Sequence, residues 1–132
     1  MSQENVEIVR HTIEAFNRDG VEATLQYFDT EVEWIGPPEW LEERFYKGHE
    51  GIRRIASQWT ENFDEYHLHS EQFIDAGDLV VVLLFGRGRI KGGAVPIEQE
   101  VSYVWGVRNG KGVHIQVYLA WDQALEAAGL RE

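Results

Sequence analysis

The longest strongly apolar stretch of the chain is Leu79-Val80-Val81-Val82-Leu83-Leu84-Phe85, and it decides the fold class. A strand over these residues would be apolar on both faces, whereas a sheet with one face in water alternates apolar and polar residues. The run is far too short to cross a bilayer. We therefore expect a sheet with helices on one face and a second copy of the chain on the other, forming a homodimer. The alternative is that the chain's own last helix covers that face.

Three more strands are predicted around this run, over residues 66–74, 98–108 and 113–121, with the apolar strand itself extending over 79–90. Gly77 and Gly92-Gly93 mark turns between them, and Asn109-Gly110 is the strongest hairpin signal in the chain. Together they predict an antiparallel meander in the second half of the protein.

The first half is predicted to be mainly helical. Val6, Val9, Ile13 and Phe16 form one apolar stripe of a helix that ends at Gly20. A short second helix, a strand over residues 31–35, a loop over 37–48 and a third helix over about 50–63 follow. A last short helix is expected over 123–128. Helices followed by a meander indicate an α+β fold, in one domain spanning residues 1–132.

Composition excludes several classes of function. The chain has 12 basic and 23 acidic residues, a net charge of −11, so its surface would repel nucleic acids and anionic membranes. It has no cysteine, which rules out disulfides and thiolate metal sites. The N-terminal residues have neither the basic start nor the apolar core of a signal peptide, so we expect a cytoplasmic protein.

Several segments together resemble the SnoaL-like proteins of the nuclear transport factor 2-like (ketosteroid isomerase-like) superfamily. The residues that carry the resemblance span most of the chain: Ala15 to Gly20 with Glu22-Ala23, Val32-Glu33-Trp34, Tyr46 to Ile52, Tyr118-Leu119 and Ala124 to Leu130. The resemblance implies a cystatin-like cone, in which a curved antiparallel sheet wraps around three N-terminal helices. It also implies a pocket open at one end and a dimer through the outer sheet face. It does not imply one function, because relatives include isomerases, polyketide cyclases, hydrolases and transport adaptors.

The catalytic residues of these relatives do not carry over. On the isomerase pattern, the first-helix tyrosine falls on Thr12, the carboxylate base on Gly36 and the second oxyanion donor on Tyr103. Only Tyr103 could donate a proton. The aspartate that SnoaL-like relatives carry after the Tyr-Leu pair is Ala120 here.

Residue parity supplies the remaining candidates for the pocket. If Val81, Leu83 and Phe85 face the interior of the cone, Arg87 does so as well, near the mouth. A buried arginine needs an anionic partner, which would be a ligand or a carboxylate of the protein. Tyr103 and Arg87 are thus the candidate catalytic residues. The expected pocket residues are Thr12, Trp34, Trp40, Trp59, Phe63, Phe85, Arg87, Tyr103 and Trp105.

Three functions stay open. The first is an isomerase, cyclase or hydrolase type of enzyme that acts on a small apolar or polycyclic molecule, with Trp40 as a lid. The second is a non-catalytic binder of such a molecule, and the third is a protein-interaction module with Trp40 and Phe45 as its contact. We expect no cofactor and no metal, because His67, His69 and Glu71 lie in a line on one strand face. Gly86-x-Gly88 lies within a strand and so does not resemble a phosphate-binding loop.

Overall fold

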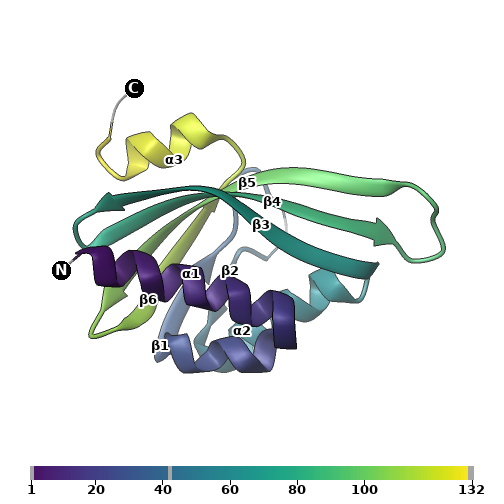
Figure 1. The fold of residues 1–132 in the computed structure, drawn as a ribbon, viewed down its shortest axis with the longest axis horizontal. Helices are drawn as coiled ribbons and strands as arrows, with labels where there is room; N and C mark the ends of the chain where they lie inside the picture. The colour runs from purple at the N-terminus through teal and green to yellow at the C-terminus, as the bar shows by residue number, and fades with distance from the viewer. Residues whose placement is uncertain (1, 42, 131–132) are drawn as a thin grey trace.

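The computed structural model describes residues 2–41 and 43–130, and it shows an α+β fold built on one curved, open sheet (Figure 1). The elements follow in the order α1 (Ser2–Asp19), the 3-10 helix η1 (Val21–Tyr27), β1 (Phe28–Ile35), β2 (Phe45–Lys47), α2 (Gly48–Thr60), β3 (Phe63–Ala76), β4 (Leu79–Ile90), β5 (Pro96–Arg108), β6 (Lys111–Tyr118) and α3 (Trp121–Ala127). The expected α+β class is confirmed.

The six strands lie in the order β2-β1-β6-β5-β4-β3. Strands β3 to β6 form the predicted antiparallel meander, and β2 is antiparallel to β1. The pair β1 and β6 is parallel, so the sheet is mixed and not wholly antiparallel as expected. The long hairpin β4–β5 projects beyond the helices, as the right-hand side of Figure 1 shows.

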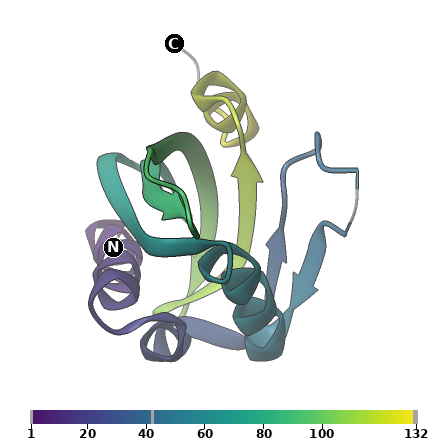
Figure 2. The same ribbon diagram turned by 90° about the vertical axis from the view of Figure 1, so that its right-hand side faces the viewer.

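Helices α1 and α2 lie against one face of the sheet, and α3 lies against the other (Figures 1 and 2). The predicted stripe of α1 explains its packing, because Val6, Val9 and Ile13 are buried in the main core. On the opposite face, Ala124 and Leu125 of α3 pack against Val81 and Val104 in a second, smaller cluster. In residues 2–41 and 43–130, no helix combines the length and apolarity that a membrane span requires.

Local signals correctly marked the turns. The backbone φ angles of Asn109 and Gly110 are 54° and 75°, the left-handed pair that a two-residue hairpin of this type requires. Gly20 ends α1 with a φ of 91°, and its N–H donates to the carbonyl of Phe16 over 2.9 Å.

Two elements differ from the expectation. The second helix is a 3-10 helix, after which Phe28 already belongs to β1. The interval predicted as a loop contains β2, whose pairing places Tyr46 opposite Trp34. Three residues are too few to show an alternating pattern, and only the neighbouring edge of β1 defines this strand.

Candidate functional site

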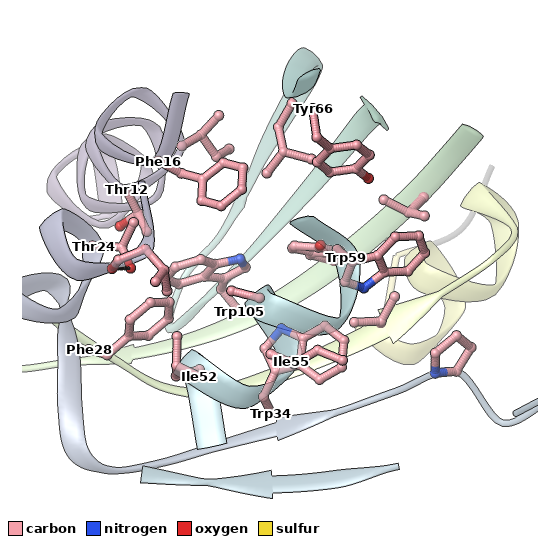
Figure 3. Close-up of a pocket in the computed structure, with 18 of the residues that line it drawn as sticks. Thr12, Phe16, Thr24, Phe28, Trp34, Ile52, Ile55, Trp59, Tyr66 and Trp105 are labelled. Atoms are coloured by element: carbon pink, nitrogen blue, oxygen red, sulfur yellow. Dashed lines mark hydrogen bonds between the residues drawn. The ribbon is translucent and has the colours of Figure 1, made fainter. Parts of the chain in front are cut away.

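A cavity of about 120 Å³ lies between the helices and the inner face of the sheet (Figure 3). Its lining comes from α1, η1, α2 and most of the strands, so residues far apart in the sequence meet there. The described side chains that line it are mainly aromatic and aliphatic: Thr12, Ile13, Phe16, Val21, Thr24, Phe28, Trp34, Pro37, Trp40, Ile52, Ile55, Ala56, Trp59, Tyr66, Leu68, Gln99, Val101, Tyr103, Trp105, Val117 and Leu119.

Ring-to-ring contacts organise one wall. The ring of Trp34 meets Tyr46 and Tyr103 edge-on, at centroid distances of 5.7 and 6.4 Å, and lies 6.1 Å from Trp40. On α2, Trp59 stacks on Tyr66 at 5.9 Å. Such offset and edge-on pairs are favourable arrangements of aromatic side chains, so this wall is well defined in shape.

Two strand glycines make room for the aromatic rings from β3. A Cβ atom at Gly86 would lie 2.1 Å from the Tyr66 hydroxyl oxygen, and one at Gly88 would lie 2.3 Å from the Glu65 carbonyl oxygen and 3.1 Å from the rings of Phe63 and Tyr66. The Gly86-x-Gly88 pattern therefore has a packing role, since larger residues would displace these rings.

The cavity carries no formal charge along its described lining, because none of the residues there is Asp, Glu, Lys, Arg or His. Its polar groups are the hydroxyls of threonine and tyrosine, the indole N–H groups and the Gln99 amide. Burial raises the pKa of Tyr66 to about 12, and burial together with the nearby Tyr66 raises the pKa of Tyr103 as well. Both tyrosines are thus neutral at pH 7, and each hydroxyl can donate or accept a hydrogen bond.

The structure brings most of the sequence-predicted pocket residues together. Those that line the cavity are Thr12, Trp34, Trp40, Trp59, Tyr103 and Trp105. Phe63 lies just outside it, stacked on Trp59 at 6.3 Å, and faces an open groove that shares Trp40 and Trp59 with the cavity. These two tryptophans line both the cavity and the groove.

The prediction of which face of β4 points to the interior was wrong. The predicted placement of Phe85 and Arg87 in the pocket was therefore wrong as well. The register pairs Val82 with Tyr103 and Leu84 with Val101. All four residues belong to the main core, and Tyr103 and Val101 also line the cavity. Because neighbouring residues of a strand point to opposite faces, Phe85 and Arg87 lie on the outer face. Arg87 is exposed there and forms an ion pair with Glu98, the residue opposite it on β5. It therefore lies outside the cavity.

Sequence reasoning missed five polar or aromatic members of the lining, namely Phe16, Thr24, Phe28, Tyr66 and Gln99. Two of them carried a usable signal. Tyr66 shares its strand parity with the apolar Leu68, and Gln99 shares its parity with Tyr103.

The histidines of β3 lie away from the cavity. His67 and His69 are exposed, and the Nε2 atom of His69 lies 3.2 Å from the Glu71 carboxylate. Across residues 2–41 and 43–130, no group of three or more His, Cys, Asp or Glu side chains is placed to hold a metal ion.

Comparison with known proteins supports the fold. TerC, co-crystallised with polyporic acid, superposes with a TM-score of 0.77 at 21% identity, covering 96% of this chain and 98% of its own. A protein with a ketosteroid isomerase-like fold from Catenulispora acidiphila DSM 44928, in complex with trimethylamine, has a TM-score of 0.75, 20% identity and coverages of 94% and 93%. A SnoaL-like polyketide cyclase by name, from Jannaschia sp. CCS1, has a TM-score of 0.75, 16% identity and coverages of 88% and 85%.

At these identities the solved structures establish the fold, which is also that of nuclear transport factor 2-like and cystatin-fold proteins. No curated protein matches the chain. The profile of the SnoaL-like domain matches residues 9–115, which include most of the cavity lining. The chain therefore belongs to the family of SnoaL-like domains.

Proposed function

We propose that this protein binds a small, uncharged, mostly apolar molecule in the cavity. The observation that carries the proposal is the lining. Its described residues are mainly aromatic and aliphatic, and none of them is charged at pH 7. A charged ligand would lose its hydration there without gaining a counter-charge. An apolar ligand would fill this poorly solvated space and gain contacts with the aromatic rings.

Cavity volume limits the size of the ligand. An engineered protein cavity of about 150 Å³ holds benzene. The present cavity, of about 120 Å³, is somewhat smaller, so its ligand is limited to about the size of one ring. A polycyclic molecule would have to extend between Trp40 and Trp59 into the groove beyond them.

The cavity favours binding over turnover. Proton abstraction needs a base within hydrogen-bond reach of the substrate. The described lining offers neutral hydroxyls, indoles and one amide, which donate or accept hydrogen bonds but do not take up a proton at pH 7. We therefore prefer the binding function to the isomerase or cyclase type of enzyme.

The interaction-module alternative fits less well. Trp40 packs inward against Trp34 and the core, which leaves Phe45 and Leu41 as the exposed large apolar side chains of this region. The homodimer through the outer sheet face and the cytoplasmic location stay predictions.

Binding can be tested by calorimetric titration with benzaldehyde, styrene and benzoate, which are similar in size and differ in charge. We expect dissociation constants of about 0.1–1 mM for the two neutral compounds, given their few heavy atoms. Benzoate should not bind measurably. Equal affinity for benzoate would contradict the proposed selection for uncharged ligands.

A cavity-filling variant supplies the control. Ala56→Leu adds a side chain to the cavity wall and should abolish binding, whereas Ala127→Leu adds the same atoms to the exposed surface of α3 and should leave it unchanged. Failure of all three compounds to bind to the unmodified protein would overturn the proposal.

A further inference from the structure

The indole of Trp105 holds a buried hydrogen-bond donor without an acceptor. The side chain is only 3% exposed, and its Nε1 atom has no hydrogen-bond partner among residues 2–41 and 43–130. Buried donors in native proteins nearly always have partners, so an unpaired one calls for an explanation. The only other buried side-chain atom in this condition in the described chain is the hydroxyl of Ser102, which lies on the opposite face of β5.

The ring of Trp105 is held in one orientation. Phe28 stacks on it at a centroid distance of 5.3 Å and an interplanar angle of 20°. Gly112 lies against its six-membered ring, since a Cβ atom there would be 2.7 Å from Cζ3. With a ring on one side and backbone on another, the indole cannot turn its nitrogen elsewhere without disturbing the core.

The nitrogen is turned toward the cavity. Figure 3 shows it on the side of the indole away from Thr12 and Thr24, facing the space between Phe16 and Trp59. The two threonine hydroxyls already donate to backbone carbonyls, at 2.7 Å to Ile8 and 2.6 Å to Val21. The Trp105 donor thus faces the space in which the ligand is proposed to bind.

We propose that the Trp105 Nε1–H group selects ligands with an uncharged oxygen acceptor, such as the carbonyl of an aromatic aldehyde or ketone. The inference rests on the proposed function and adds the chemical class of the ligand. The hydroxyls of Tyr66 and Tyr103 on the same wall can donate or accept a hydrogen bond, whereas the indole N–H of Trp105 can only donate. A site with an unpaired donor discriminates against an isosteric molecule without an acceptor, because binding that molecule leaves the donor unpaired.

Benzaldehyde and styrene test the inference, because they have nearly the same shape and only benzaldehyde has an oxygen. We expect the protein to bind benzaldehyde about tenfold more tightly, equivalent to about 1.4 kcal/mol. In protein with ¹⁵N-labelled tryptophan, benzaldehyde should move the Trp105 indole N–H resonance downfield, and styrene should not. This measurement uses the unmodified protein, so it does not depend on the folding of a variant.

Two variants test whether the Trp105 donor causes the difference in affinity between benzaldehyde and styrene. Trp105→Phe removes the donor and should reduce the affinity ratio to about one, while also identifying the Trp105 resonance by its loss. Trp121→Phe removes an indole outside the cavity and should preserve the ratio. Binding of both compounds with equal affinity and no Trp105 shift would overturn the inference while the proposed function stands. Binding of neither compound would overturn both.

Discussion

The inner and outer faces of the β4–β5 ladder differ sharply although they share the same two strands. The inner face carries Val82, Leu84 and Tyr103, which pack in the main core beside the cavity. The outer face carries Val81 beneath α3, then the half-buried Leu83, and finally the exposed pair of Arg87 and Glu98. One face thus encloses an uncharged space, while the other passes from apolar to charged along its length.

This difference shows that an unbroken apolar run does not indicate which face of a strand points to the interior. Alternation tells which residues of a strand share a face, but it does not tell which face is inside when both are apolar. The residues at the end of the run could have settled the choice. Gly86 has the small size that the inner face needs, and Arg87 has the charge that the outer face tolerates.

The largest expected difference between the faces comes from two adjacent leucines. Leu84→Ala should lower the free energy of unfolding by about 2–5 kcal/mol, because Leu84 is fully buried in the main core. Leu83→Ala, on the outer face, should cost about 1 kcal/mol or less in the monomer. Urea unfolding of both variants measures the difference.

Protein concentration sharpens the same comparison. A loss at Leu83 that approaches the loss at Leu84, and that depends on protein concentration, would show that a second copy covers the outer face. Equal losses independent of concentration would contradict the assignment of the two faces.

An intermediate effect is expected at high pH. Tyrosines of the unfolded chain ionise near about pH 10. Since burial raises the pKa of Tyr66 to about 12, its stabilising contribution is complete below about pH 10 and is lost as the pH rises toward about 12. The loss should be on the order of 2 kcal/mol, and the half-buried Tyr103, whose pKa is also raised, should add to it.

Urea unfolding between about pH 9 and pH 11.5, with tyrosinate absorbance as a second probe, measures this dependence. Tyr66→Phe should flatten it. Tyr118→Phe, on the outer face, should change it less, because desolvation acts on a more exposed hydroxyl there. An equal effect of the two substitutions would remove the distinction between the faces.

The smallest effect is expected at the Arg87–Glu98 pair. Its side chains are 64% and 48% exposed, so removal of either partner should change the free energy of unfolding by less than about 1 kcal/mol. A double-mutant cycle of Arg87→Ala and Glu98→Gln at low and high salt measures the coupling, which salt should weaken. Benzaldehyde binding should be unchanged, and a strong loss of binding would return Arg87 to the candidate site.

The sequence by itself determined the α+β class, the family and the order of the elements apart from β2. These depend on local chemistry: the stripe of α1, the Asn109-Gly110 turn and the aromatic residues at matching parity on β5. It also identified the four tryptophans of the described cavity lining, since large aromatic residues at buried positions have few other places to pack.

Only the tertiary structure decided which face of β4 points inward, that Tyr66 joins the cavity, and that the Trp105 nitrogen lacks an acceptor. Each of these depends on residues distant in the chain. Tyr103 of β5 lies opposite Val82, Gly86 makes room for a ring from β3, and Gly112 of β6 holds the Trp105 indole. Register between strands and the volume left between side chains arise from the packing of the whole chain, so no local pattern specifies them.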